Sequence, residues 1–430
     1  MSDRELARRH RAVLPSWMAL YYEEPVSIAR GEGCRVWDGD GNSYLDLFGG
    51  ILTTISGHGV PEIVEAVRDQ AGRVLHTSTL YLIEPQIELA ETICRLAPIE
   101  DPKVFFTSSG TEATDAALLL ATSYRRSNQV LALRHSYHGR SFSAMSVTGN
   151  RSWSASGLSP FSVSYALNAY RYRNPFGDVS DDELIRACAA DLREIIETTT
   201  AGDIACLIAE PIQGVGGFIT PPDGLLGAYK QVCEEAGILF VDDEVQTGWG
   251  RTGEHFWGIE AHGVTPDIMT FAKGVGNGMA LAGVVAGAEI MDCLAANSIS
   301  TFGGNPVATA AALANIRFIL DNDLQTNAQK VGEHLKGRLL ELQTSHPSIG
   351  DVRGKGLMIG VELVRPGGKE PDPEMAARVL EGAKARGVLV GKGGLYGNTL
   401  RIAPPMILTR DEADEACEAL AGAIAGAERS

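Results

Sequence analysis

The sequence predicts an α/β protein with a mainly parallel central sheet in a large domain, joined to a smaller α+β domain formed by both ends of the chain. First, short apolar runs alternate with helical patterns through the middle of the chain, which is typical of a parallel sheet covered by helices on both faces. Second, 430 residues are too many for one hydrophobic core. Third, both flanks lack this alternation, so we expect them to form a separate unit.

Six apolar runs in the middle of the chain are expected to form the strands of the central sheet. They are residues 103–107, 129–133, 204–209, 238–241, 268–272 and 283–286. Helices are expected between them, including 112–124 and 224–236, and Gly237 stands where a helix C-cap would fall. Ligands of such sheets bind beyond the carboxyl ends of the strands, so residues that follow an apolar run are the first candidates for a site.

The flanks of the chain contain different patterns. Residues 34–46 predict a hairpin with a Gly-Asn turn. The C-terminal part predicts a helix over 325–344, strands over 357–363 and 399–403, and a last helix over 411–427. We therefore expect a small domain from residues 1–55 and 323–430, beside a large domain from residues 56–322.

Composition limits the partners and the compartment. The formal net charge of −17 argues against nucleic acid or anionic membranes as partners. Seven cysteines without pairing or metal-ligand spacing indicate free thiols in a reducing cytoplasm and no metal site. No run approaches 18 apolar residues and the N-terminus lacks a secretory signal, so we expect a soluble cytoplasmic protein.

A lysine and an acidic pair each follow an apolar run. Lys273 ends one run and precedes a glycine-rich segment, and Asp242 and Asp243 end another. A lysine amine can form a Schiff base with pyridoxal 5'-phosphate (PLP), and a carboxylate can keep the pyridine nitrogen protonated. Adjacent strand residues point to opposite faces, so only one of the two aspartates can do so. A lone lysine after a strand is usually a solvated cation, so the wider sequence must decide.

The segments around these residues resemble the signature of class III aminotransferases. Asp-Glu-Val-Gln-Thr-Gly-Trp-Gly-Arg-Thr-Gly at 243–253 is followed by Phe-Ala-Lys-Gly-Val-Gly-Asn-Gly at 271–278. The resemblance extends from about Glu24 to Thr409 and is strongest to the branch with alanine–glyoxylate and ω-amino-acid:pyruvate aminotransferases. It implies the PLP-dependent transferase fold type I, the fold of aspartate aminotransferase.

The resemblance implies how the cofactor ring would be held. Lys273 would bind PLP covalently and Asp243 would meet the pyridine nitrogen. Tyr137 would cover one face of the ring, although a core tyrosine is the simpler interpretation of the residue alone. Gln246 would bond to the phenolic oxygen, although it could equally be a surface amide. His138 is assigned no chemistry.

The phosphate of PLP would be held at a helix start. Ser109, Gly110 and Thr111 lie between an expected strand and an expected helix, where backbone N–H groups favour an anion. An ordinary N-cap explains these residues as well. The resemblance implies that Thr301 reaches the phosphate from a neighbouring subunit, which predicts a homodimer with shared active sites, or a tetramer of such dimers.

Arg401 lies in an otherwise apolar predicted strand, where a guanidinium needs a planar anionic partner such as a carboxylate. The resemblance implies that it binds the substrate carboxylate. Glu210 would pair with Arg401 when the substrate end lacks a carboxylate, and a permanent ion pair is the structural alternative. Tyr22 is expected to line the substrate pocket.

These residues together predict a PLP-dependent aminotransferase that moves an amino group from an amino acid or ω-amine to pyruvate or glyoxylate in a ping-pong cycle. Alternatives of the same fold are an aminomutase, a decarboxylating transaminase, or a 4-aminobutyrate or acetylornithine type of enzyme that uses 2-oxoglutarate. A regulator without turnover is disfavoured because Lys273, Asp243 and Arg401 occur together. An NAD enzyme is disfavoured because no Gly-x-Gly-x-x-Gly segment links a strand to a helix.

Overall fold

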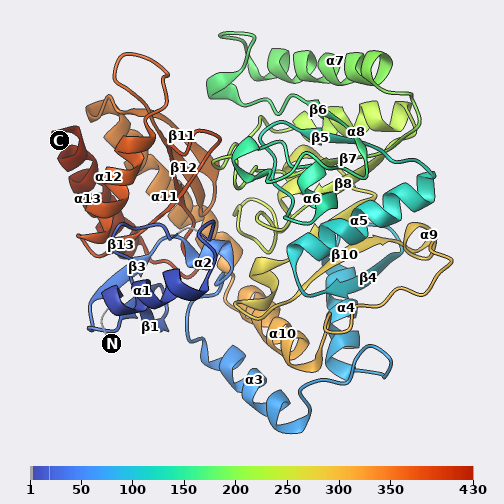
Figure 1. Ribbon diagram of the computed structural model, residues 1–430, viewed down its shortest axis with the longest axis horizontal. Coiled ribbons are helices and arrows are strands. Elements are labelled where there is room, and N and C mark those ends of the chain that lie inside the picture. Colours follow the sequence, from blue (N-terminus) through green and yellow to red (C-terminus); the bar gives the residue numbers. More distant parts are fainter. Residues whose placement is uncertain (1–2, 19, 430) are drawn as a thin grey trace.

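A seven-stranded sheet lies at the centre of the larger part of the molecule (Figure 1). The computed structural model describes residues 3–18 and 20–429. The sheet order is β4-β10-β9-β8-β7-β5-β6. Its strands are β4 (Pro102–Thr107), β5 (Gln129–Leu133), β6 (Ser162–Ala166), β7 (Ile204–Ala209), β8 (Leu239–Asp243), β9 (Ile268–Phe271) and β10 (Ala282–Gly287). Only β10 runs antiparallel to its neighbours, so the predicted α/β class with a mainly parallel sheet is confirmed.

All six predicted runs form strands of this sheet, and their ends lie within two residues of the predicted ones. The strand that the sequence did not reveal is β6. Its sequence, Ser-Val-Ser-Tyr-Ala, carries few large apolar side chains, because an edge strand is not packed on both faces. The strand β8 extends two residues beyond the predicted end and includes both Asp242 and Asp243.

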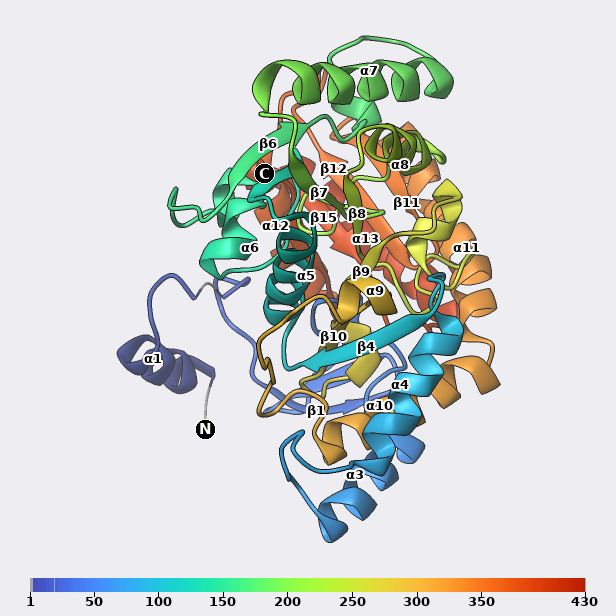
Figure 2. The same cartoon turned by 90° about the vertical axis from the view of Figure 1, so that its right-hand side faces the viewer.

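Helices cover both faces of the central sheet, and alternating strand side chains pack against them (Figure 2). On one face α5 (Gly110–Arg125) contacts β7, β9 and β10. On the other face lie α7 (Asp181–Thr199) and α8 (Leu225–Glu235). Gly237 has a φ of 66°, which fits the C-cap position expected after α8. The long helix α10 (Pro306–Asp321) packs against α3 (Pro61–Arg73) and α4 (Glu84–Leu96).

The smaller part combines both ends of the chain, which Figure 1 shows as blue and red elements side by side. One of its sheets has the order β1-β2-β3-β13 and the other has the order β11-β12-β15-β14. The strand β13 pairs in parallel with β3, so a C-terminal strand completes the N-terminal sheet. The strands are β1 (Ile28–Glu32), β2 (Arg35–Asp38), β3 (Ser43–Asp46), β11 (Ile349–Lys355), β12 (Met358–Leu363), β13 (Val388–Leu389), β14 (Gly391–Gly393) and β15 (Thr399–Ile402).

The helices of the small part are α1 (Asp3–Val13), α11 (Leu324–Ser345), α12 (Pro373–Lys384) and α13 (Arg410–Glu428). Three of them, α11, α12 and α13, pack against these sheets, whereas α1 lies apart from them (Figure 2). The predicted hairpin is formed by β2 and β3, and α11, β12, β15 and α13 occupy the other predicted C-terminal ranges. Short helices elsewhere are α2 (Gly49–Leu52), α6 (Phe142–Ser146) and α9 (Ala288–Met291). Among the described residues, no helix has the length and apolarity needed to cross a membrane.

Candidate active site

A cavity of about 330 Å³ lies at the carboxyl ends of the central strands and gathers most of the predicted site residues. Its wall includes the following side chains and glycines: Ser109, Gly110, Thr111, Tyr137, His138, Glu210, Asp243, Gln246 and Lys273. These residues come from segments that follow β4, β5, β7, β8 and β9. Strand ends that meet at one edge of a parallel sheet therefore bring together side chains more than 160 positions apart in the sequence.

Lys273 begins a short turn directly after β9. Its φ is 44°, a left-handed conformation that is costly for a residue with a side chain and is typical of functional positions. Burial lowers the pKa of Lys273 to about 8, while Asp243 and Glu210 draw that pKa upward and Arg401 lowers it further. An appreciable fraction of the amine is therefore neutral near pH 7 to 8, as a nucleophile and proton carrier requires.

Asp243 is the last residue of β8 and its carboxylate is buried in the cavity wall. Its Oδ2 lies 2.6 Å from Nδ1 of His138, and its Oδ1 accepts a hydrogen bond from the Val245 N–H. Burial disfavours the His138 imidazolium, but the hydrogen bond and charge of Asp243 outweigh this and raise the pKa of His138. Asp242 does not line the cavity. The opposite-face argument thus holds, with Asp243 on the cavity side.

The helix α5 begins at Gly110 and directs its first N–H groups toward the cavity. Ser109 is its N-cap and accepts a hydrogen bond from the Glu112 N–H at 3.3 Å, while the Glu112 carboxylate accepts one from the Ser108 N–H at 2.7 Å. The N-cap role considered for Ser109 is therefore realised. The free N–H groups of a 16-residue helix form a suitable seat for a phosphate.

Arg401 and Glu210 both lie in this region, but they do not form an ion pair within the described chain. Arg401 donates a hydrogen bond to Gln246 Oε1 at 2.8 Å, and burial lowers the pKa of Arg401 to about 10. Glu210 accepts hydrogen bonds from the N–H groups of Tyr137 and Gly214, and burial raises its pKa to about 7. The alternative of a permanent Arg401–Glu210 pair is therefore wrong.

A buried amine, a buried carboxylate and a helix N-terminus around one cavity are the groups that PLP requires, so the residues fit this cofactor. The family model for class III aminotransferases matches residues 19–424. The chain belongs to the class III aminotransferases. The family and the PLP-dependent fold type I predicted from the sequence are confirmed.

Individual relatives of this aminotransferase match nearly the whole chain. The alanine–glyoxylate aminotransferase 2 homolog 2, mitochondrial, of Arabidopsis thaliana is 42% identical over 97% of this chain and 87% of the relative. The alanine/serine racemase of Pyrococcus horikoshii is 37% identical over 98% and 90%. The crystal structure of an (S)-enantioselective ω-transaminase from Thermomicrobium roseum superposes with a TM-score of 0.91, at 36% identity and 99% coverage of both chains.

Three predicted residues of this aminotransferase, Tyr22, Thr301 and Arg401, do not line the cavity. Tyr22 donates a hydrogen bond from its hydroxyl to the Val390 carbonyl oxygen at 3.4 Å. The neighbouring Tyr21 stacks on the ring of Phe48, and the guanidinium of Arg401 lies over that same ring. Thr301 is exposed and does not line the cavity of its own chain. The contact of His138 with Asp243 was not predicted from the sequence. The position of His138 directly after Tyr137 was the one feature of the sequence that placed this histidine near the site.

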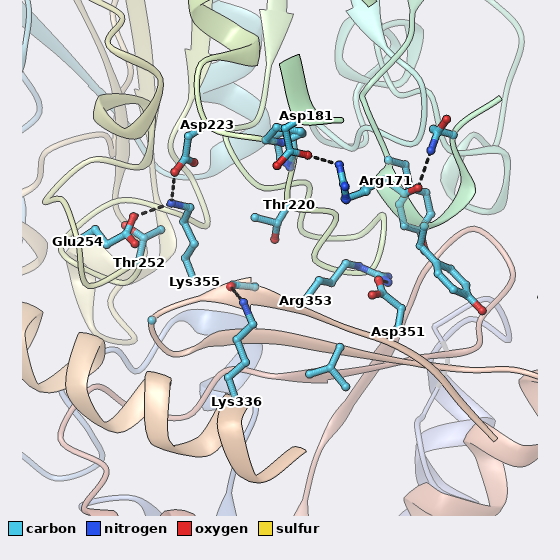
Figure 3. Close-up of a pocket in the computed structure, with 18 of the residues that line it drawn as sticks. Arg171, Asp181, Thr220, Asp223, Thr252, Glu254, Lys336, Asp351, Arg353 and Lys355 are labelled. Carbon is cyan, nitrogen blue, oxygen red and sulfur yellow. Dashed lines mark hydrogen bonds and ion pairs between the residues drawn. The ribbon is translucent and has the colours of Figure 1, made fainter. Parts of the chain in front are cut away.

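A larger cavity of about 840 Å³ lies elsewhere, between the two parts of the molecule (Figure 3). Its ammonium and guanidinium groups have partners within the chain. Lys355 contacts Asp223 at 2.9 Å and Glu254 at 2.5 Å, and Arg353 contacts Asp351 at 2.7 Å. None of the predicted cofactor residues lines this cavity, so its size does not indicate the catalytic centre.

Proposed function

We propose that this aminotransferase transfers the amino group of a small amino acid or ω-amine to pyruvate or glyoxylate in a ping-pong cycle. The observation that carries the proposal is the lowered pKa of Lys273 in a cavity that also contains Asp243 and the N-terminus of α5. A neutral amine next to a buried carboxylate and an anion seat suits amino-group transfer on PLP. The 42% identity to an alanine–glyoxylate aminotransferase homolog supports a small oxo acid as acceptor.

Each side chain has a role in this proposal. When bound, PLP supplies the electron sink that lets the carbon bearing the amino group lose a proton. Lys273 would hold and move that proton between the substrate carbon and the cofactor. Asp243 places its negative charge at the pyridine nitrogen, with His138 holding the carboxylate in position. Tyr137 and Gln246 line the same cavity, where they would hold the ring and its phenolic oxygen.

The remaining residues bind the two anionic groups, the phosphate of PLP and the carboxylate of the substrate. Ser109, Gly110 and Thr111 hold the phosphate at the start of α5. Arg401 binds the carboxylate of the oxo acid: it is buried and its Nε has no hydrogen-bond partner among the described residues, which leaves donors free for a bidentate ligand. Tyr22, a residue of the small part, flanks the entrance through which the substrate reaches the cavity.

We also propose a homodimer in which Thr301 of one protomer reaches the phosphate of the other. Leu80, Tyr81 and Leu82 are 73%, 70% and 95% exposed, and the Phe302 ring stacks on His76 at 4.9 Å. Large apolar side chains that are exposed at consecutive positions favour a protein–protein contact. A second copy of the chain covers it and brings Thr301 to a cavity. The proposal further includes a cytoplasmic location and the boundaries 1–55, 56–322 and 323–430.

The experiment that tests the proposed function separates transfer from other PLP reactions. The PLP-loaded protein is incubated with L-alanine alone, and pyruvate formation is followed together with the loss of the PLP absorption. One equivalent of pyruvate per active site, and continued turnover after addition of glyoxylate, is the expected result. Multiple turnovers to D-alanine without an acceptor would instead establish a racemase, as the name of one relative suggests, and release of carbon dioxide would establish a decarboxylating enzyme.

A further inference from the structure

A second buried arginine of the small part binds a main-chain oxygen of the larger part. Arg353, on β11, donates to the Gly217 carbonyl oxygen from Nε at 3.0 Å and from Nη2 at 2.7 Å. Its Nη1 contacts the carboxylates of Glu362 at 2.8 Å and Asp351 at 2.7 Å. Arg353 is 8% exposed and Glu362 is 1% exposed. The planar guanidinium thus holds one carbonyl with two hydrogen bonds while its charge is balanced within the small part.

The orientation of this guanidinium is fixed by contacts away from the cofactor cavity. Glu362 accepts hydrogen bonds from the Tyr170 hydroxyl and, at 2.7 Å, from Nε of Arg173, and both donors belong to the larger part. The central carbon of the Arg353 guanidinium lies 4.8 Å from the ring centroid of Tyr170. A guanidinium that lies over an aromatic face and meets a buried carboxylate has little freedom to turn.

Arg353 and Arg401 stand in one row of the small sheet with a glycine between them. Arg353 pairs with Gly360 between β11 and β12, and Gly360 pairs with Arg401 between β12 and β15. Side chains in one row point to the same face of a sheet. A Cβ atom on Gly360 would lie 2.8 Å from the Gly217 carbonyl oxygen. The carbonyl that Arg353 binds therefore occupies the space between the two arginines.

The turn that carries this carbonyl has a costly backbone conformation. Gly217 has a φ of 100°, and Phe218 has a φ of 53°, a left-handed value that a phenylalanine adopts only where its surroundings hold it. The Phe218 ring is fully buried, and its centroid lies 4.7 Å from the guanidinium carbon of Arg401. The same segment begins at the cavity wall, where Glu210 accepts the Gly214 N–H at 2.8 Å.

We propose that Arg353 is a positioning residue for the substrate pocket, which holds the Gly217–Phe218 turn against the small part and thereby sets the place of Arg401. The proposal rests on the proposed function for the role of Arg401. Among the described residues, no hydrogen bond or ion pair joins Arg353 to Lys273 or Asp243. Loss of Arg353 therefore weakens substrate binding and leaves proton movement at Lys273 intact, which raises KM at unchanged kcat.

The first test compares Arg353→Met with Lys355→Met in the PLP-loaded enzyme. Lys355 lies two positions further along β11 and also bridges the two parts, but it contacts Asp223 and Glu254 and not the turn (Figure 3). With L-alanine as donor, KM for glyoxylate is expected to rise on the order of tenfold in Arg353→Met, while kcat stays about the same. Lys355→Met should keep both constants. Equal rises in KM in the two variants, or a loss confined to kcat, overturn the proposal.

The second test needs no turnover. Hydrogen–deuterium exchange of the PLP-loaded protein is followed by mass spectrometry in peptides that cover residues 211–219. Exchange there should be on the order of tenfold faster in Arg353→Met than in the wild type, because the turn has lost the partner of its carbonyl, and unchanged in Lys355→Met. Unchanged exchange in a folded Arg353→Met protein contradicts the proposal.

A second variant covers the case in which Arg353→Met does not fold. Arg353→Lys keeps a positive charge beside Glu362 but lacks the fork that binds the Gly217 carbonyl, so it takes the place of Arg353→Met in both tests. Wild-type KM and wild-type exchange in Arg353→Lys overturn the proposal. A wild type that does not transaminate L-alanine and glyoxylate overturns the proposed function instead, and the exchange measurement still decides whether Arg353 holds the turn.

Discussion

The Nδ1 atom of His138 lies 2.6 Å from Oδ2 of Asp243, and both side chains are buried. The two residues are 105 positions apart: His138 follows β5 and Asp243 ends β8, with β7 between these two strands in the sheet. The contact fixes the orientation of the carboxylate that faces the proposed cofactor.

Replacement of His138 by Gln is expected to reduce the rate of amino-group transfer and the stability of the protein. The loss of a charge-assisted hydrogen bond in a buried site costs about 1.5–3 kcal/mol. The pKa of His138 is raised in the folded protein. Its contribution to stability is therefore fully present below the unfolded pKa near 6.5 and is lost as the pH rises through the folded value.

Urea unfolding of the wild type and of His138→Gln between pH 5.5 and 9 measures this contribution. The difference in the free energy of unfolding should be greatest at the acidic end and decrease toward pH 9. A difference that does not change with pH would show that His138 acts through packing alone.

Asp243→Asn is expected to keep the fold and to bind PLP but to transaminate on the order of 10²–10³-fold more slowly, because an amide supplies no negative charge at the pyridine nitrogen. Single-turnover rates with L-alanine measure the effect. Asp242→Asn is the matched variant, one position earlier on the other face of β8. A large loss in Asp242→Asn with near-normal rates in Asp243→Asn would show that the wrong aspartate has been assigned.

Asp242→Asn has a second expected effect, on stability. Burial, and then the neighbouring charge of Glu244, raise the pKa of Asp242 well above its ordinary value. A raised folded pKa means that stability is present below the unfolded pKa near 3.8 and is lost as the pH rises toward the folded value. Asparagine does not titrate, so the variant should gain stability over the wild type between pH 4 and pH 9.

Chemical unfolding of both proteins without cofactor at pH 4, 7 and 9 checks this gain. Asp321→Asn, an exposed substitution, serves as the control and should not change the pH dependence. A stability difference between Asp242→Asn and the wild type that is equal at all three pH values would mean that Asp242 is ionised in the folded protein.

Arg401→Ala should damage the half-reaction with pyruvate far more than any residual half-reaction with isopropylamine. The guanidinium meets a carboxylate through charge-assisted hydrogen bonds that contribute about 1.5–3 kcal/mol each, so a loss of at least tenfold in kcat/KM for pyruvate is expected. The two half-reactions are measured separately by stopped-flow absorption. Equal losses in both would reduce Arg401 to a structural residue.

The central strands could be predicted because strands buried on both faces are nearly continuous apolar runs. The edge strand β6 could not, since Ser162 and Ser164 interrupt its apolar pattern. The alternation of side chains along a strand predicted that Asp242 and Asp243 point to opposite faces. Which of them faces the cavity depends on how β8 lies in the sheet, and here the sequence had only the family resemblance as a guide.

The candidate site was predictable where a residue lies at the end of a strand, as Asp243 does in β8, or just after one, as Lys273 does after β9. The surroundings of Arg401 were not. Phe48, Phe218 and Gly393 come from three segments that meet only in the folded protein, and no local pattern marks any of them. The hydrogen bonds that hold Glu210 were equally out of reach of the sequence, because their backbone donors at Tyr137 and Gly214 are brought to it only by the tertiary fold.

The most direct measurement for the whole account is the identity of the lysine that carries PLP. The loaded protein is treated with borohydride, digested and mapped by mass spectrometry, and Lys273→Ala is treated in parallel. A pyridoxyl group on Lys273 alone, and none in the variant, is the predicted result. A label on any other lysine, or an unlabelled wild type that has bound PLP, would contradict the assignment of Lys273 and the mechanism built on it.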